Sequence, residues 1–336
     1  MKNQRKPWIW VDEAIYPNEQ TTYVCHASDW ANSVYAVAEF SRVFKYDKAV
    51  KSVRLTVCGD TSFRLWLNEQ FVGTGPVCGG GDFLEARPLP KAYHNTYEVL
   101  VHENVLRFFA QVQLSPVVLS DYSRGHGGFF LESVVCFADG TTEKISTNSS
   151  WNSRINRKYK ESHVFDDRVL ETAWTPAKQI DDIWHTVNPP IPMMCEEMIL
   201  PQEGERICVA AHETCVAEVL FDKIYAGYVN LAVTCQGTCR IVVKCCEVEN
   251  GAGTTETITA GNNLSYRSFQ FHSIGRYEME ISNESDAPCI IKPSLIFTHY
   301  RVGACLDAHA VWHDYLHVKA GGSPVPEEIR VLPEEC

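Results

Sequence analysis

The 336-residue sequence lacks long apolar runs and an excess of basic charge. No apolar stretch approaches the roughly 18 residues that mark a membrane-spanning helix, so we expect no membrane segment. Asp12 and Glu13 follow the basic first ten residues at once, leaving no apolar signal-peptide core, and we predict a cytoplasmic protein. Lys and Arg number 30 against 42 Asp and Glu, a net charge of −12. Phosphate binding needs clustered basic side chains, so we expect no nucleic-acid partner.

Local catalytic motifs are also missing. The sequence has no GxSxG nucleophile elbow and no phosphate-binding P-loop. Glycoside hydrolysis needs two carboxylates that flank one bond, whereas adjacent acids such as Asp166 and Asp167 point to opposite faces of a strand. Twelve histidines leave Cys–His catalysis open, without a local signature that favours it. We predict no catalytic residue and no cofactor in this chain.

Cysteine is abundant, with 14 residues. Without an export signal, this number indicates reduced and mostly buried thiols. Cysteines gather between Cys208 and Cys246, together with His212, which raises the alternative of a zinc site. Their spacings match no close CxxC pair, and Cys245 and Cys246 would point to opposite faces of one strand. We therefore predict no metal site.

Alternation of apolar and polar residues dominates the sequence up to about residue 300. Val53, Leu55 and Val57 alternate with polar residues, and dense turn signals such as Gly59-Asp60 and Asn68-Glu69 separate such runs. A period of two is typical of half-buried strands in antiparallel sheets. The same pattern recurs in three further runs: Phe63, Leu65 and Leu67; Val229, Leu231 and Val233; and Ile241, Val243 and Cys245. We predict an all-β chain made of two antiparallel β-sandwich domains.

A proline-rich segment suggests the domain boundary. Residues 188–194 (NPPIPMM) contain three prolines in five positions, which cannot continue a central strand. We place the first domain at 8–187 and the second at 195–303. Residues 304–336 would form a short irregular or helical C-terminal tail.

The predicted tail contains three regularly spaced histidines. His309, His313 and His317 would share one face if residues 306–319 were helical, and such spacing can hold a metal. We favour the simpler interpretation of a solvated terminal helix.

An ordered series of segments resembles one enzyme family. In the first domain these are RLWLNEQFVG at 64–73 followed by Gly75-Pro76, HENVLRFFAQV at 102–112, and FDDR at 165–168. In the second domain they are FDKIYAGYVNLAV at 221–233 and FQFH at 269–272 before Gly275-Arg276-Tyr277. Over residues 8–303 the chain resembles the N-terminal, non-catalytic β-sandwich domains of bacterial α-L-rhamnosidases. The resemblance implies a jelly-roll or galactose-binding-like first sandwich.

The resemblance also implies where the chemistry lies. In this family the catalytic acids belong to an (α/α)6 barrel after the second sandwich, and nothing after Gly303 is long enough to form it. We therefore expect the chain to be inactive alone, as an accessory or scaffold portion from a truncated gene or altered reading frame. Two alternatives are a stand-alone carbohydrate-binding module and one chain of a split α-L-rhamnosidase with a barrel-carrying partner chain.

A rhamnose-containing glycan is the expected ligand, because jelly-roll domains of this type hold sugars at loop tips. An aromatic face would stack on the sugar while polar side chains bond its hydroxyls. The simpler alternative is that the loop residues are only solvated. The candidates in two loops are Asp82, Phe83 and Arg87, and Tyr122, Arg124 and His126.

Other conspicuous residues have structural interpretations. We expect Gly73, Gly75 and Gly227 to serve special backbone angles or close packing. We expect Arg276 to pair with a carboxylate such as Glu247. Large aromatics should fill cores or edges, as we expect for Trp66, Trp151, Trp174 and Trp184.

Overall fold

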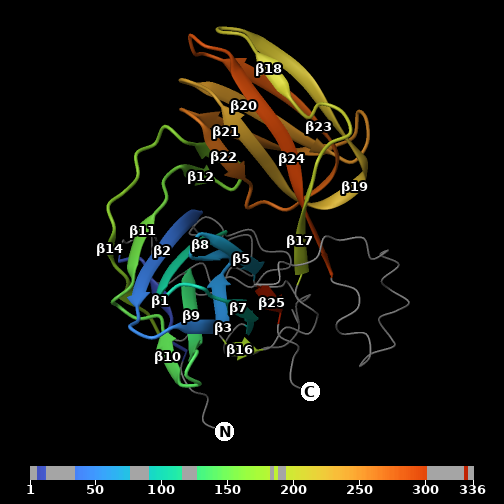
Figure 1. Ribbon diagram of the computed structural model, residues 1–336. Coiled ribbons are helices and arrows are strands. Elements are labelled where there is room, and N and C mark those ends of the chain that lie inside the picture. Colours follow the sequence, from blue (N-terminus) through green and yellow to red (C-terminus); the bar gives the residue numbers. More distant parts are fainter. Residues whose placement is uncertain are drawn as a thin grey trace, which may run out of the picture. The chain divides into compact units, whose positions relative to one another are not determined.

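The computed structural model of the protein describes residues 6–12, 35–75, 91–115, 127–181, 185–187, 194–300 and 329–331. Every regular element in these ranges is a β-strand, which confirms the predicted all-β class (Figure 1). No helix within the described residues has the length and apolar character needed to cross a membrane.

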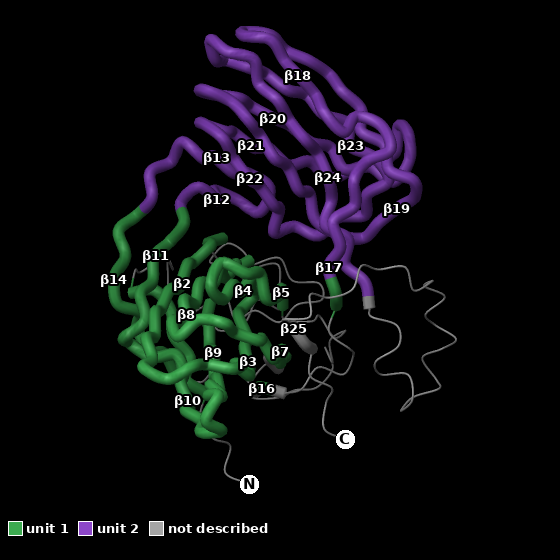
Figure 2. Tube along the Cα trace, viewed as in Figure 1, with its two compact units in different colours: residues 1–156, 172–195, 300–336 green, residues 157–171, 196–299 purple. Residues whose placement is uncertain are grey.

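The chain forms two compact units (Figure 2). Unit 1 comprises residues 1–156, 172–195 and 300–336, and unit 2 comprises residues 157–171 and 196–299. The sequence placed residues 157–171 within the first domain, whereas this segment packs in unit 2. The chain therefore leaves unit 1 after Asn156 and returns to it at Thr172.

Unit 1 contains two large sheets. The first has the order β15 (Lys178–Gln179), β1 (Ile9–Trp10), β9 (Gly128–Phe137), β3 (Val50–Asp60), β7 (Asn95–Leu100) and β25 (Ile329–Val331), with β10 (Thr142–Ser146) also on β9. The second has the order β14 (Thr175–Pro176), β11 (Asn152–Ile155), β2 (Ala36–Lys45), β8 (Val105–Leu114), β4 (Ser62–Leu67) and β5 (Gln70–Gly75). β16 (His185–Val187) and β6 (Lys91–Tyr93) form a separate parallel pair.

The alternation in the sequence explains the large apolar core of unit 1, beside which Trp8, Cys58 and Phe130 form a small second cluster. Val53, Leu55 and Val57 are buried on one face of β3, and Phe63, Leu65 and Leu67 on one face of β4. Both runs belong to the same hydrophobic cluster, which also holds Trp151. Burying one face of each sheet against the other gives the predicted sandwich.

Of two turns predicted in unit 1, one is confirmed and the other is wrong. Asn68 and Glu69 join β4 to β5 with φ angles of 50° and 66°, the left-handed region that tight hairpins require. Gly59 and Asp60 do not form a turn, because both pair with β9 at the end of β3. The bend lies one residue further, at Thr61.

Unit 2 is built from one ten-stranded sheet and has an apolar core of its own. Its main order is β12 (Tyr159–Glu161), β13 (Val164–Asp166), β21 (Gly253–Ala260), β20 (Cys239–Cys246), β23 (His272–Asn283), β19 (Thr214–Thr234), β24 (Cys289–Tyr300) and β17 (Met194–Ile199). β18 (Ile207–Val209) pairs with β24, and β22 (Leu264–Arg267) pairs with β19. The predicted inward runs at 229–233 and 241–245 are buried in this core, which confirms them.

The long strand β19 pairs with three neighbours in this sheet, β22, β23 and β24. Its first part pairs with β23, its last part pairs with β24, and the register shifts between Leu220 and Tyr225. Gly227 pairs with both neighbours, at His272 and at Phe297. A side-chain carbon at Gly227 would overlap the carbonyl of Ile296, so the predicted close packing at this glycine is confirmed.

The predicted tail is described only at residues 329–331. These form β25, which pairs antiparallel with β7 at the edge of the first sheet. This segment is neither irregular nor helical, since the edge of β7 offers backbone groups that a short strand can satisfy. His309, His313 and His317 lie outside the described residues.

Candidate functional site

All six predicted sugar contacts lie outside the described residues. Asp82, Phe83 and Arg87 fall in the connection from β5 to β6. Tyr122, Arg124 and His126 fall in the connection from β8 to β9. The loop-tip site thus stays a prediction.

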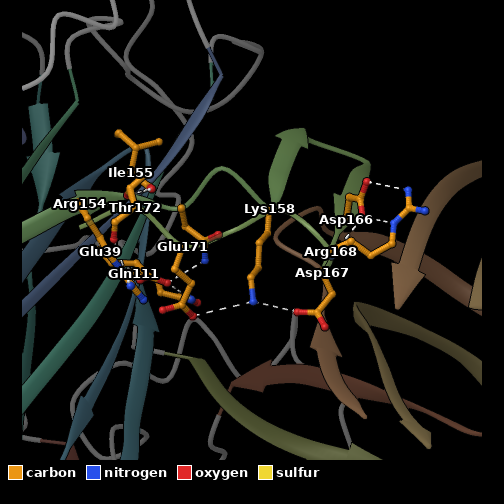
Figure 3. Close-up of polar contacts among 11 residues, drawn as sticks. Glu39, Gln111, Arg154, Ile155, Lys158, Asp166, Asp167, Arg168, Glu171 and Thr172 are labelled. Carbon is orange, nitrogen blue, oxygen red and sulfur yellow. Dashed lines mark hydrogen bonds and ion pairs between the residues drawn. The ribbon is translucent and has the colours of Figure 1, made fainter. Parts of the chain in front are cut away.

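A buried carboxylate organises the non-core face of the six-stranded sheet in unit 1. Glu39 is only 3% exposed although it lies on the opposite face of β2 from the core residue Phe40. Its Oε1 atom accepts hydrogen bonds from Gln111 Nε2 at 3.0 Å and Asn156 Nδ2 at 2.8 Å, and its Oε2 atom accepts one from Arg154 Nε at 2.7 Å (Figure 3). We call Glu39, Gln111, Arg154 and Asn156, together with Trp174, the Glu39 cluster.

Strand register explains why these residues meet. Glu39 on β2 lies opposite Gln111 on β8 and opposite Arg154 on β11. Gln111 in turn lies opposite Arg64 on β4. Residues directly opposite in antiparallel pairs share a face, so a polar row crosses four strands of this sheet.

Arg154 links this row to an exposed aromatic ring. Its guanidinium carbon lies 4.4 Å from the ring centroid of Trp174, whose side chain is 39% exposed. Arg154 Nη1 also donates to the carbonyl of Thr172 at 3.4 Å, and Thr172 Oγ1 donates to the carbonyl of Ile155 at 2.7 Å. The guanidinium is thus held between a buried carboxylate and an accessible indole.

The Glu39 cluster is suited to binding rather than to acid–base chemistry. Three donors engage the two oxygens of Glu39, and this carboxylate orients Arg154. An accessible indole beside a fixed guanidinium provides an apolar stacking face next to hydrogen-bond donors, the combination expected at a sugar-binding surface. Sequence reasoning missed Glu39, Gln111 and Arg154, although polar residues at the non-core positions of strands were a usable signal.

The tryptophans that were predicted to fill cores or edges differ in their burial. Trp151 is fully buried in the core of unit 1, as expected, and Trp66 is half-buried beside Phe71 and Phe109. Trp174, in contrast, is partly exposed. Trp184 lies outside the described residues.

The segment 157–171 carries a second polar group, within unit 2. Asp166 accepts hydrogen bonds from Arg168 Nε at 2.9 Å, from Arg168 Nη2 at 3.1 Å and from Lys160 Nζ at 2.8 Å. Lys158 Nζ lies 2.9 Å from Asp167 Oδ1 and 3.8 Å from Glu171 Oε1 (Figure 3). The hydrogen bonds from Arg168, supported by Lys160, hold the pKa of Asp166 well below its usual range, against the opposing effect of burial. These contacts fasten the turn after β13, which pairs parallel with β21.

A series of hydrogen bonds runs from the exposed residue Thr254 to three buried residues of unit 2. Thr254 Oγ1 lies 2.6 Å from His272 Nδ1, and His272 Nε2 lies 2.6 Å from Glu256 Oε1. Tyr266 donates its hydroxyl to Glu256 Oε2 at 2.5 Å. Hydroxyl, imidazole and carboxylate follow the order of a nucleophile relay. We nevertheless assign these four residues a structural role, because the side chains of His272 and Glu256 are fully buried and the Tyr266 hydroxyl occupies the second oxygen of the Glu256 carboxylate.

The predicted partner of Arg276 is wrong. Arg276 Nη2 lies 2.5 Å from Glu218 Oε1, and Arg276 Nη1 lies 4.0 Å from Glu249 Oε2. Glu247 instead places its backbone carbonyl against Gly275. Glu218 and Arg276 are diagonal neighbours on the paired strands β19 and β23, since the residue directly opposite Arg276 is Leu220.

Ten cysteines fall within the described residues, and all ten are free thiols. Seven of them are buried, in agreement with the prediction: Cys58, Cys195, Cys235, Cys239, Cys245, Cys246 and Cys289. Burial raises the pKa of Cys235 to about 11 and that of Cys245 further. Over the part of the chain that the structure describes, no group of three His, Cys, Asp or Glu side chains is arranged to hold a metal ion.

The two units define a protein of the double β-sandwich class. Neither a family model nor a curated protein matches the sequence. Solved α-L-rhamnosidases are similar in structure. The one from Dictyoglumus thermophilum has a TM-score of 0.57 at 15% identity, over 88% of this chain and 35% of that chain.

Two further solved α-L-rhamnosidases are similar in structure to this chain. The Aspergillus terreus protein has a TM-score of 0.53 at 15% identity, over 82% of this chain and 37% of that one. The Streptomyces avermitilis α-L-rhamnosidase, complexed with L-rhamnose, has a TM-score of 0.53 at 18% identity, over 80% of this chain and 29% of that one. The chain thus spans between 29% and 37% of the length of these three proteins. At this identity the likeness shows a shared fold, so the predicted resemblance to part of a rhamnosidase is confirmed for the fold.

Proposed function

We propose that the chain is a non-catalytic, carbohydrate-binding scaffold of α-L-rhamnosidase type, with a rhamnose-containing glycan as its ligand. The observation that carries the proposal is the accessible Trp174 ring stacked on Arg154, which Glu39 fixes from the buried side. The similarity of fold to rhamnosidases, one of them complexed with L-rhamnose, supports the choice of sugar.

The chemistry of rhamnose suits this surface. Rhamnose is an uncharged deoxyhexose whose methyl group and C–H bonds give it an apolar side, and its hydroxyls both donate and accept hydrogen bonds. The indole of Trp174 can cover the apolar side while Arg154 donates to a hydroxyl. A neutral ligand also fits a chain of net charge −12, which would repel an anionic one.

Calorimetric titration of L-rhamnose into the purified chain tests the proposal. We expect saturable binding, and the Trp174→Ala variant should weaken it by roughly tenfold, the equivalent of about 1.4 kcal/mol of lost contact. Val43→Ala is the matched control. Val43 is 46% exposed and lies four positions along β2 from Glu39, hence on the same face of that strand.

A hydrolysis assay on the same sample tests the absence of catalysis that we propose. An aryl α-L-rhamnoside should be turned over no faster than the blank. Turnover well above the blank would mean that the chain holds a carboxylate pair of its own, and the scaffold proposal would fall.

The second candidate function is one chain of a split α-L-rhamnosidase. The observation that favours it is the similarity of fold to 29% to 37% of the length of the rhamnosidase chains. Co-purification of this chain with a barrel-carrying chain, together with rhamnosidase activity of the pair, would support this candidate. A chain that binds sugar but recruits no such partner would leave the binding module as the better account.

A further inference from the structure

Unit 2 has an exposed aromatic residue of its own. Phe271 is 50% exposed, and among the described aromatic side chains only this one and Trp174 are so accessible. Its ring lies 5.5 Å from that of Tyr228, at an interplanar angle of 79°. Phe271 therefore presents apolar surface beside the half-buried Tyr228 ring, which is nearly perpendicular to it.

A fixed pair of charges lies beside these rings. The guanidinium carbon of Arg267 lies 4.8 Å from the ring centroid of Tyr228. Arg267 Nη1 and Nη2 donate to the two carboxylate oxygens of Glu196 at 2.8 Å and 2.6 Å, a two-point contact that fixes the guanidinium plane. Because the two charges offset each other, the local field favours a neutral ligand over an ion.

Backbone contacts set the position of Phe271. The Ser268 amide donates to the carbonyl of Val229 at 2.9 Å, and the Val229 amide donates to Ser268 Oγ at 3.0 Å. Ser268 Oγ in turn donates to the carbonyl of Gln270 at 2.9 Å. Ser268 thus ties the connection between β22 and β23 to β19, next to Tyr228, and holds Phe271 against that ring without burying it.

We propose that Phe271, Tyr228, Arg267 and Glu196 form a second sugar-binding platform, on unit 2, for an uncharged pyranose with an apolar side. The two rings would contact the C–H and methyl groups of the sugar, while the guanidinium and the carboxylate would donate to and accept from its hydroxyls. This repeats the combination found at the Glu39 cluster, where an exposed ring also lies beside an Arg–Glu pair. The choice of a rhamnose-type ligand rests on the proposed function, whereas the platform itself rests on the geometry of unit 2.

Calorimetry of the full chain with L-rhamnose, compared across variants, tests this inference. We expect more than one sugar per chain for the unmodified protein. Phe271→Ala should remove one site and leave the affinity of the other unchanged, and Phe271→Tyr should keep both because the ring remains. Val216→Ala, which alters a 79% exposed residue of unit 2, should behave like the unmodified protein.

The outcomes separate this inference from the proposed function. If Trp174→Ala abolishes all binding while Phe271→Ala changes nothing, the proposed function stands and the second platform does not exist. If Phe271→Ala abolishes all binding while Trp174→Ala changes nothing, the platform is established and the Glu39 cluster is not a site. Self-association that Phe271→Ala removes, without sugar binding, would mean that the platform contacts a second copy, and this too overturns the inference.

Discussion

His272 Nε2 lies 2.6 Å from Glu256 Oε1, and neither side chain is exposed to solvent. This pair joins strands β21 and β23 inside the core of unit 2. Thr254 at the other imidazole nitrogen and Tyr266 at the other carboxylate oxygen satisfy the remaining polar atoms. A buried pair of this kind stabilises a fold only while both partners are present.

Removal of one partner should therefore cost more than removal of both. We expect His272→Leu to lower the free energy of unfolding of unit 2 by about 3–5 kcal/mol, because it leaves the Glu256 carboxylate buried without its partner. The double variant His272→Leu/Glu256→Leu should be more stable than the single variant. Urea unfolding monitored by circular dichroism measures both changes, and a double variant less stable than His272→Leu would contradict this account.

Acid should weaken the contacts of the segment 157–171. The folded-state pKa of Asp166 lies below its unfolded value near ~4, so its stabilising contribution is complete above that pH. The contribution is lost as the pH falls toward the folded pKa. Asp166→Asn should therefore be less stable than the unmodified protein at pH 7, by an amount that shrinks steadily below about pH 4. Urea unfolding at several pH values checks this, and a difference that stays constant down to pH 2.5 would contradict it.

Thiol reactivity should follow burial. Cys208 is exposed on β18, whereas burial raises the pKa of Cys235 to about 11 and leaves little thiolate at neutral pH. We expect iodoacetamide to modify Cys208 long before Cys235, Cys245 or Cys289 in the folded protein, and all of them at similar rates in urea. Peptide mass spectrometry over a time course resolves the individual sites. Equal rates in the folded protein would show that the core of unit 2 opens readily.

Close packing at Gly227 should tolerate no side chain. A methyl group there would overlap the carbonyl of Ile296 on β24, a backbone atom that cannot turn aside, so Gly227→Ala should lower the free energy of unfolding by about 3 kcal/mol. Gly140→Ala is a useful comparison, because this glycine lies in open space with a φ of 83° and should cost only the strain of that angle, about 1–2 kcal/mol. Thermal unfolding of the two variants ranks them, and the reverse order would contradict the packing argument.

The strands could be predicted from sequence because burial of one sheet face imposes a period of two. Val53, Leu55 and Val57 show this pattern in three alternate positions, and the structure buries all three. Turn residues were nearly as informative, as Asn68 and Glu69 confirm with their left-handed angles. Both patterns involve residues that are close together in the sequence, so they can be recognised without knowing which strands pair.

The candidate sites could not be predicted in this way, because they depend on which strands are neighbours. Glu39 and Arg154 are 115 positions apart in the chain and meet only because β2 pairs with β11. Arg267 on β22 and Glu196 on β17 are 71 positions apart and meet although their strands are not paired, since β22 pairs with β19 and β17 lies next to β24. Nothing local signals that residues 157–171 leave unit 1, since the parallel pairing of β13 with β21 is a long-range contact.

Calorimetric titration of L-rhamnose into the full chain and its Trp174→Ala variant tests the central claim most directly. The account predicts saturable binding by the unmodified chain, a roughly tenfold weaker affinity at the altered site, and no change for Val43→Ala. Binding that is identical in all three proteins would contradict the assignment of the Glu39 cluster as a sugar site. No binding by the unmodified chain would contradict the carbohydrate-binding function itself.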